Sequence, residues 1–421
     1  MKIADIVRML TVEAPALHFS AYDGSSFGAE DAPFQLSLVN ERGLRYLATA
    51  PGDLGLARAY VSGDLVLSGA HPGNPYEALR QLETWRFRRP TVAEAATLLR
   101  DLGWREFVPP SPPPQESLPR WRRTIEGLRH SRARDAAAIG HHYDVSNAFY
   151  EKVLGPSMAY TCAVFPKPDA SLEEAQEEKF DLVARKLGLE RGMRLLDVGC
   201  GWGGMAMHAA KHYGVHVVAV TLSKEQAAWA QQAIVERGLA GQVQVLHSDY
   251  RDAPGSDYDA VSSIGLTEHI GVKNYPSYFT FLRDKLRVGG RLLNHCITRP
   301  DNTSRALPGQ FIDRYIFPDG ELTGSGRIIT EAQNVGLEVR HEENLREHYA
   351  LTLKAWSENL KRNWDACVAD VGDPTARVWG LYLAGSRLGF ETNGIQLHQV
   401  LAVKPSPTGE ASFPLRPTWG S

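Results

Sequence analysis

"LLDVGCGWGG", residues 195–204, places an acid and four glycines directly after the start of an apolar run. Such a stretch predicts a buried strand, a tight turn and the start of a helix, with glycines that let the backbone approach a ligand. Gly199, Gly201 and Gly204 also satisfy the G-x-G-x-x-G spacing of a dinucleotide site. The turn therefore predicts a site for an adenosine-containing cofactor, with NAD among the candidates.

The residues around the turn help to distinguish these cofactors. A dinucleotide site normally adds an acid about 20 residues further on, which binds the ribose hydroxyls. Here the second strand ends "VVAVTLS", with Thr221 at that place, and Glu225 falls one turn inside the next helix. The acid Asp197 instead precedes the glycines, as is typical of S-adenosylmethionine methyltransferases, whose cationic ligand suits a carboxylate. This interpretation is favoured, while an NAD-linked oxidoreductase stays open.

Strand and helix patterns alternate downstream of residue 120, as in a parallel sheet with crossover helices. The helix after the second strand begins at "SKEQ", where Ser223 can cap and Gln226 can reach back in a capping box. The pattern predicts an α/β fold with a doubly wound sheet. We expect its strands near residues 194–198, 215–221, 242–247, 258–264 and 290–298.

The length of 421 residues favours two domains. "VPPSPPPQESLP", residues 108–119, holds six prolines and predicts an extended linker between them. We therefore expect a smaller N-terminal α+β domain over 1–107, the larger domain over 120–405, and a disordered tail over 406–421. The N-terminal domain is expected to present substrate or to dimerise, so a homodimer stays open.

Composition limits the possible partners and locations. The 46 basic and 49 acidic residues give a net charge of −3, which offers no global reason to bind nucleic acid or an anionic membrane. No signal peptide or run of 18 apolar residues occurs, so a cytoplasmic location is expected. The four cysteines lack C-x-x-C spacing, which predicts reduced thiols and no zinc site.

Seven stretches of the larger domain together resemble the cyclopropane-fatty-acyl-phospholipid synthase family, over about residues 139–403. They are "HHYDVSNAFYEKVLGPSMAYTCAVF", "LLDVGCGWGG", "VTLSKEQ", "EHIG", "HCIT", "YIFPDGEL" and "IQLHQVLAV", in this order. The resemblance implies a class I methyltransferase, Rossmann-like fold. It also implies transfer of the methyl group of S-adenosylmethionine to the cis double bond of an acyl chain on a membrane phospholipid. The product would be a cyclopropane or a methylene- or methyl-branched fatty acid.

The resemblance further implies a bound bicarbonate ion, the base that takes a proton from the carbocation formed by methylation. Its positions correspond to Cys162, Glu268, His269, His295, Ile297 and Tyr349. Glu268 is expected to orient the ion, and His295 and Tyr349 to donate hydrogen bonds to it. Cys162 and Ile297 are expected to contribute backbone groups.

For the cofactor, the family pattern surrounds the ligand with residues of several segments. They are Tyr160 and Thr161 over it, Asp197, Gly199 and Gly201 at the turn, Thr221 and Gln226 at the ribose, and Asp249 and Tyr250 by the adenine. Several of these residues also fit structural roles. Glu268 could cap a helix, His295 could be a core histidine and Tyr349 could serve packing alone.

A basic stretch from Trp85 to Asp135 holds eleven arginines against six acids, interleaved with Phe87, Trp104 and Trp121. It predicts peripheral docking on an anionic membrane surface, where each basic residue is worth about 1 kcal/mol. A solvated helix face with buried tryptophans is the alternative, and no nucleic-acid motif accompanies the stretch. Two other functions stay open, an NAD-linked oxidoreductase and a noncatalytic lipid-binding protein on the same fold.

Overall fold

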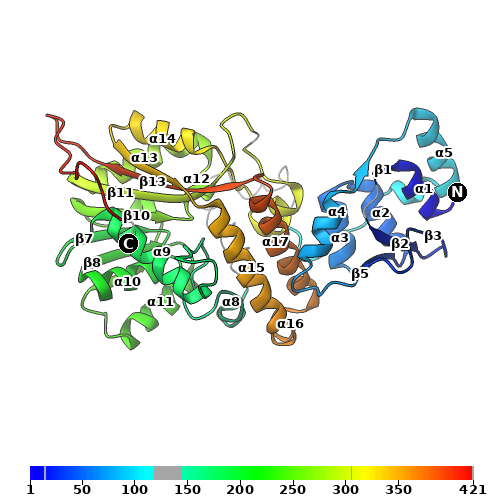
Figure 1. Cartoon of the computed structure of the whole chain (residues 1–421), viewed down its shortest axis with the longest axis horizontal. Helices are drawn as coiled ribbons and strands as arrows, with labels where there is room; N and C mark the ends of the chain where they lie inside the picture. Colours follow the sequence, from blue (N-terminus) through cyan, green and yellow to red (C-terminus); the bar gives the residue numbers. More distant parts are fainter. Residues whose placement is uncertain (14–15, 118–144, 305, 420–421) are drawn as a thin grey trace. The chain divides into compact units, whose positions relative to one another are not determined.

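The structure, a computed structural model, describes residues 1–13, 16–117, 145–304 and 306–419. The chain divides into two compact units. Unit 1 comprises residues 1–118, 309–316 and 356–388, and unit 2 comprises 119–308, 317–355 and 389–421. Each unit is described by itself below (Figure 1).

Unit 2 is built on a seven-stranded sheet of order β12-β13-β11-β10-β7-β8-β9. Strands β7 to β11 run parallel, whereas β13 pairs antiparallel with both β11 and β12. This is a doubly wound α/β architecture, as the sequence predicted. The strands are β7 Arg194–Val198, β8 His216–Thr221, β9 Val243–His247, β10 Tyr258–Ile264, β11 Leu286–Thr298, β12 Glu338–Asn344 and β13 Gln396–Val403.

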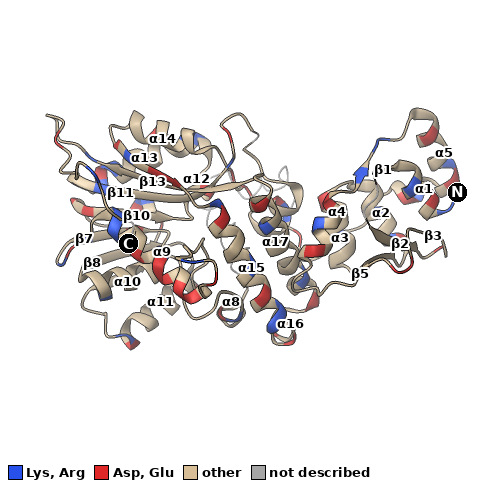
Figure 2. Ribbon diagram, viewed as in Figure 1, with Lys and Arg blue, Asp and Glu red and all other residues tan. Residues whose placement is uncertain are grey.

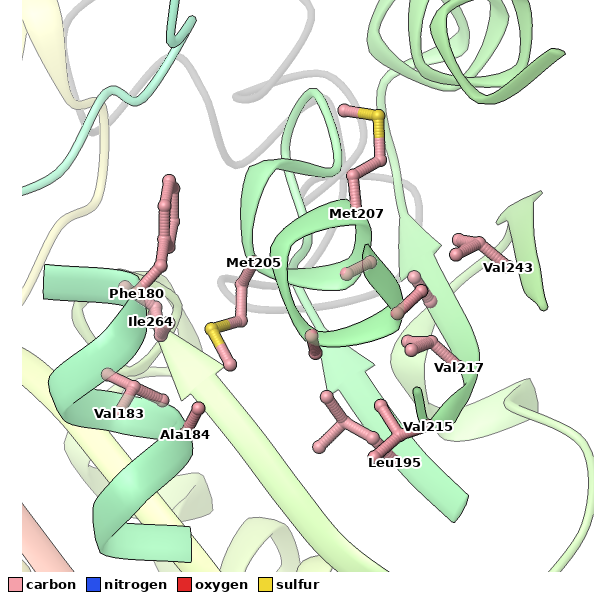
Figure 3. Close-up of a cluster of buried hydrophobic side chains, with 14 of the residues drawn as sticks. Phe180, Val183, Ala184, Leu195, Met205, Met207, Val215, Val217, Val243 and Ile264 are labelled. Atoms are coloured by element: carbon pink, nitrogen blue, oxygen red, sulfur yellow. The ribbon is translucent and has the colours of Figure 1, made fainter. Parts of the chain in front are cut away.

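Helices cover both faces of this sheet and bury one hydrophobic cluster on each. Figure 3 shows the first cluster, where Val183 of α9, Met205 of α10 and Leu195 of β7 lie together. The second cluster joins Tyr278 of α13 and Ile328 of α14 to the opposite face. The helices of this unit are α8 Asn147–Leu154, α9 Leu172–Leu187, α10 Gly204–Tyr213, α11 Lys224–Glu236, α12 Thr267–Ile270, α13 Tyr275–Lys285 and α14 Ser325–Asn334.

Capping residues determine where α9, a helix that lines the site, begins and ends. The Ser171 hydroxyl accepts from the Glu174 backbone N–H, and the Glu174 carboxylate accepts from the Ser171 backbone N–H. These two bonds form a capping box. The helix ends at Gly188, whose φ of 63° lies in the left-handed region that favours glycine.

Unit 1 contains a four-stranded sheet of order β3-β2-β4-β5 and a separate hydrophobic core. Trp85 belongs to this core, because its ring packs on Phe19 and Phe27 and its Nε1 donates to Thr11. The elements of the N-terminal segment are α1 Ile3–Leu10, β1 Thr11–Glu13, β2 Leu17–Ala21, β3 Ser26–Phe27, β4 Phe34–Leu38, α2 Glu41–Thr49, α3 Asp53–Val61, β5 Leu65–Ser68, α4 Tyr76–Glu83, β6 Arg86–Phe87 and α5 Val92–Leu102.

The division differs from the sequence expectation in that two later segments belong to unit 1. The buried Glu116 carboxylate accepts from Arg58 and pairs with Arg314 of the 309–316 segment. Leu388 of α17 joins Tyr76 in a small apolar cluster. Helices α15 Arg346–Arg362 and α17 Asp373–Glu391 span the division, and α16 Trp364–Val371 lies inside unit 1. Such contacts link residues far apart in sequence, so no local pattern reveals them.

The Pro-rich segment is anchored to unit 1 over its described residues, 108–117, and is not a free spacer there. The Ser111 carbonyl accepts from the Tyr46 hydroxyl at 2.6 Å, and the Val108 carbonyl accepts from Arg45. The first division of the chain still falls within the segment 108–119, between residues 118 and 119.

The C-terminal tail also differs from the expected disorder, because aromatic side chains anchor it to unit 2. Phe413 and Trp419 pack against the first cluster, and the Arg291 and Arg340 guanidinium groups each lie 4.7 Å from the Phe413 ring centroid. The described residues of the tail, 406–419, form no helix or strand, and these side-chain contacts hold them instead.

Candidate active site

The glycine turn lies beside a cavity at the carboxyl end of β7. The N–H groups of Gly199 and Cys200 both donate to the Val220 carbonyl, at 2.9 and 3.0 Å, and so tie the turn to β8. Gly199 and Gly201 have φ of 74° and 55°, which favour glycine. A Cβ placed on Gly201 would meet no atom within 4 Å, so the turn leaves open space for a ligand.

The cavity has about 560 Å³ of empty space, part of which is open to solvent. Six of the nine residues predicted for the cofactor line it: Tyr160, Thr161, Asp197, Gly199, Gly201 and Gln226. Lys179, Trp202 and Gly265 line it as well, and the sequence interpretation had missed them.

Asp197 brings a buried carboxylate to this cavity. Its Oδ1 accepts from the Ser262 hydroxyl at 2.6 Å, while Oδ2 is buried with no hydrogen-bond partner among the described residues. Burial raises the pKa of Asp197 to about 6, although the Ser262 hydrogen bond and Lys179 act against this. A buried acceptor without a partner is costly, so the cavity is suited to a ligand that carries a donor or a positive charge.

Lys179, on α9, is the second buried charge of the cavity. Its Nζ donates to Thr161 Oγ1 at 2.9 Å and lies 3.8 Å from the Phe180 ring centroid. Burial lowers the pKa of Lys179 to about 7, against the opposite effect of Cys162 and Asp197. The sequence carried one signal for it: Lys179 stands four residues after Ala175 and four before Val183, on the buried face of the helix.

Thr221 and Gln226, both expected at the ribose, bind each other. Thr221 Oγ1 donates to Gln226 Oε1 at 2.8 Å, and Gln226 reaches the cavity. Ser223 caps α11 by accepting from the Gln226 backbone, as expected. The Gln226 side chain binds Thr221 and does not reach back to the Ser223 backbone. The expected capping box at the start of α11 is therefore wrong in this half.

Asp249 and Tyr250, expected by the adenine, are not among the described residues that line the cavity. The Asp249 carboxylate caps the following turn and accepts from Arg251 Nε at 2.7 Å. The Tyr250 ring packs edge-on against Tyr278 and Phe281, each 5.3 Å away between centroids. An adjacent arginine and an aromatic cluster therefore hold both side chains.

Glu268, on α12 just after β10, holds a second buried carboxylate. Its Oε1 accepts from the Ile297 N–H at 2.7 Å, whereas Oε2 is buried without a partner in the described part of the chain. Burial raises the pKa of Glu268 to about 7, and the hydrogen bond from Ile297 acts against the rise. The Ile297 N–H, expected to contact an ion directly, therefore fixes the position of the Glu268 carboxylate.

His295, on β11, is oriented by a chain of hydrogen bonds. Lys186 Nζ can only donate, and it donates to Gln399 Oε1 at 2.7 Å. The Gln399 amide group therefore faces His295 Nδ1, 3.2 Å away, which makes Nδ1 the acceptor and places the proton on Nε2. His295 Nε2 is buried and has no partner among described residues, while burial lowers the pKa of this imidazole.

The remaining predicted residues lie on neighbouring segments of unit 2. Cys162 is fully buried, its Sγ donates to the Ala163 carbonyl, and burial raises the pKa of its thiol. Tyr349 is buried on α15 with its ring 4.5 Å from that of Phe390, and the His269 ring packs edge-on against Phe317. These contacts of Cys162, Tyr349 and His269 fit a role in the chemistry and a role in packing equally well.

The end of β10 connects the cavity with these buried groups. Ile264 and Gly265 line the cavity, and the Gly265 N–H donates to the His295 carbonyl at 2.8 Å. Glu268 follows three residues after Gly265. Four buried titratable side chains thus lie around the carboxyl ends of the adjacent strands β11, β10 and β7: Asp197, Lys179, Glu268 and His295. This is the expected place for a site in a doubly wound sheet.

Comparison with known proteins places this site in context. The family described as mycolic acid cyclopropane synthetase matches residues 130–400. A probable fatty acid methyltransferase of Mycobacterium tuberculosis is 61% identical over 421 residues, which cover 100% of this chain and 98% of that protein.

Two further relatives match a little under two thirds of this chain. The cyclopropane-fatty-acyl-phospholipid synthase of Escherichia coli is 36% identical over 62% of this chain and 66% of its own length. A crystal structure of a mycolic acid cyclopropane synthase complexed with SAH and CTAB is similar with a TM-score of 0.60 and 34% identity, over 63% of this chain and 97% of that one.

Proposed function

The chain belongs to the mycolic acid cyclopropane synthetase family, and from this premise we propose that it methylates the cis double bond of an unsaturated acyl chain of a membrane phospholipid. Membership makes the chain an S-adenosylmethionine-dependent methyltransferase of fatty acyl substrates. The phospholipid and the double bond belong to our proposal. The observation that carries it is the juxtaposition of the glycine-turn cavity with the buried, partly unpartnered Glu268 and His295.

The cavity fits S-adenosylmethionine by its donors, acceptors and space. Asp197 Oδ2, which has no hydrogen-bond partner in the described part of the chain, would bind the ammonium group of the ligand. Gly201 leaves room for close approach of the ligand to the backbone, and Gln226 offers its amide from α11. When bound, the cofactor supplies an electrophilic methyl group.

The reaction explains why the neighbouring polar groups are buried. An alkene is a weak nucleophile, and its methylation leaves a carbocation that water would capture, so the site must exclude water. A base must then remove a proton without attacking the cation. Glu268, with a pKa raised to about 7, and the proton-bearing His295 Nε2 offer an acceptor and a donor in such a dry place.

We place a small anion, bicarbonate, between these groups as the immediate base. Its hydroxyl would donate to Glu268 Oε2 and one oxygen would accept from His295 Nε2, which would satisfy two buried atoms that have no partner among the described residues. The ion would supply the oxygen that receives the proton. Tyr349, Cys162 and His269 remain predicted contributors on neighbouring segments.

Docking on an anionic membrane is the part of the proposal that concerns substrate delivery. No helix in the described part of the chain is both long and apolar enough to cross a membrane. Phe87 and Trp104 are 55% and 67% exposed, and both lie in the basic stretch. Trp85, in contrast, belongs to the core of unit 1, and Trp121 lies outside the described residues. The homodimer remains a prediction.

Replacing Glu268 with Gln tests the proposed chemistry. The amide keeps an oxygen for the Ile297 N–H but loses the acceptor at Oε2, so turnover is expected to fall by about 10², the usual scale for a positioned base. Affinity for S-adenosylmethionine, measured by calorimetry, should change little. Glu338→Gln, on strand β12, is the control.

The opposite pattern would contradict the assignment. If Glu268→Gln binds S-adenosylmethionine weakly and a saturating dose restores full turnover, then Glu268 belongs to the cofactor site. An equal loss of turnover in Glu338→Gln would point to a general effect of removing an acid.

A further inference from the structure

Two pairs of potential metal ligands face each other across helices α9 and α10, which pack together in unit 2 (Figure 1). Glu177 and Asp181 stand four residues apart on α9, and His208 and His212 stand four apart on α10. Residues at this spacing share one face of a helix. Figure 2 shows the acidic residues that lie along α9.

Three of these side chains converge. One ligand atom each from Glu177, His208 and His212 lies within 4.8 Å of the other two. The two imidazole rings stack, with centroids 4.5 Å apart and an angle of 28° between their planes. Glu177 and His212 are exposed, so an ion could reach the cluster from solvent.

His208 supplies an independent reason to expect a ligand here. Its side chain is only 8% exposed, and Nε2 is buried with no hydrogen-bond partner among the described residues. The nearest carboxylate atom, Asp181 Oδ1, lies 3.7 Å away, beyond hydrogen-bond distance.

Asp181 is held by other partners, which leaves three ligands for an ion. Its Oδ1 accepts from the Tyr213 hydroxyl at 2.6 Å, and its Oδ2 pairs with Arg185 at 3.2 Å. These contacts hold the Asp181 carboxylate beside His208.

We propose that Glu177, His208 and His212 bind a divalent first-row transition-metal ion, with Zn²⁺ as the ion that fits best. Two imidazole nitrogens and one carboxylate oxygen match the ligand set of three-ligand zinc sites, in which water completes the tetrahedron. Ligand atoms around Zn²⁺ lie about 3.4 Å apart. The exposed Glu177 and His212 side chains have the freedom to close the remaining distance.

The position of this site gives it a structural consequence. Helix α9 contributes Lys179 and Phe180 to the cofactor cavity, and α10 contributes Gly204 and Met205. An ion that joins α9 to α10 would fix two walls of that cavity. The proposal stands independently of the acyl substrate, since it rests on these side chains alone. It also differs from the sequence expectation, which considered cysteine ligands and overlooked "HAAKH", residues 208–212.

Titration with Zn²⁺ alone tests the site. Untagged, chelator-treated protein is expected to take up one equivalent in calorimetry, and Co²⁺ should give the visible absorption of a site with four or five ligands. His212→Gln and Glu177→Gln, both at exposed positions, should weaken Zn²⁺ binding at least tenfold. His216→Gln changes another exposed histidine of unit 2 and should bind as the parent does.

Thermal unfolding separates loss of the site from loss of the fold. Without metal, the variants should melt like the parent. With Zn²⁺, the melting temperature should rise in the parent and in His216→Gln only, because a ligand stabilises the state that binds it. Absence of saturable Zn²⁺ uptake by the parent, or parent-like uptake by both ligand variants, would overturn the proposal.

Discussion

At the scale of single residues, burial sets the chemistry of the site. It raises the pKa of Asp197 to about 6 and that of Glu268 to about 7, and it lowers the pKa of Lys179 to about 7. The pKa values of two carboxyl groups and one ammonium group, which ordinarily lie on opposite sides of pH 7, are thereby brought close to it. Such displaced pKa values are typical of functional sites.

Gly201→Val is expected to abolish binding of S-adenosylmethionine. The added side chain would point into open space at the turn, where the ligand must approach the backbone. Calorimetry measures the affinity, and circular dichroism checks the fold, because φ of 55° also strains valine. Gly241→Val, at an exposed turn, is the control. Unchanged affinity in folded Gly201→Val would rule out the turn as the cofactor site.

Asp197 should make cofactor affinity depend on pH. Its pKa is raised to about 6 by burial, so the carboxyl group becomes neutral as the pH falls through that value. Attraction for the cationic ligand is then lost, and affinity should decrease below pH 6. Asp197→Asn should bind more weakly at neutral pH and show a smaller pH dependence in calorimetry. A parent affinity that stays constant between pH 5 and 7 would contradict this role.

The sequence could predict the turn and Asp197 because they form one local pattern. For Lys179 the sequence carried only its four-residue spacing to Ala175 and Val183. The residue stands among the charged residues of "EEAQEEKF", and its role depends on burial by other segments. Asp249 and Tyr250 differ from expectation for a related reason. Arg251 and the Tyr278 and Phe281 rings engage them, and no pattern in the sequence specifies those contacts.

At the scale of elements, strands buried on both faces were the easiest to predict. Strand β7 reads "RLLDV" and β8 reads "HVVAVT", and both are short apolar runs. Strand β12 reads "EVRHEEN" and lies at the edge of the sheet, where its charged side chains meet solvent. Its pattern therefore resembles a loop. The antiparallel return of β13 onto β11 likewise depends on long-range pairing.

The basic stretch should act at the level of an element as a membrane contact. Arg88 is paired with Glu94, whereas Arg86 and Arg89 are exposed neighbours at β6 and just after it. The double variant Arg86→Gln and Arg89→Gln is expected to sediment less with anionic vesicles, and the difference should shrink in high salt through screening.

A matched pair of cations supplies the control for this sedimentation experiment. Lys224→Gln with Arg237→Gln removes two exposed charges from unit 2 and should leave vesicle binding unchanged. Equal binding of the parent to neutral and anionic vesicles would leave the basic stretch without this role.

At the scale of the whole molecule, every residue assigned to the chemistry comes from unit 2, although the family match from 130 to 400 includes segments of both units. The return of residues 356–388 to unit 1 gives that unit helices from the C-terminal third of the chain. Chain length and the Pro-rich stretch predicted two units but could not reveal this exchange, because it depends on long-range packing such as that of Tyr76 and Leu388 in one apolar cluster.

Mass spectrometry of phospholipid after incubation with methyl-deuterated S-adenosylmethionine tests the central claim most directly. Vesicles should contain both unsaturated and saturated acyl chains. We predict that only unsaturated chains gain one carbon. This carbon should keep two of its three deuterium atoms, because one is removed as a deuteron. Glu268→Gln should form about 10²-fold less product. Label on saturated chains or headgroups, or no label on any acyl chain while the cofactor binds, would contradict the account.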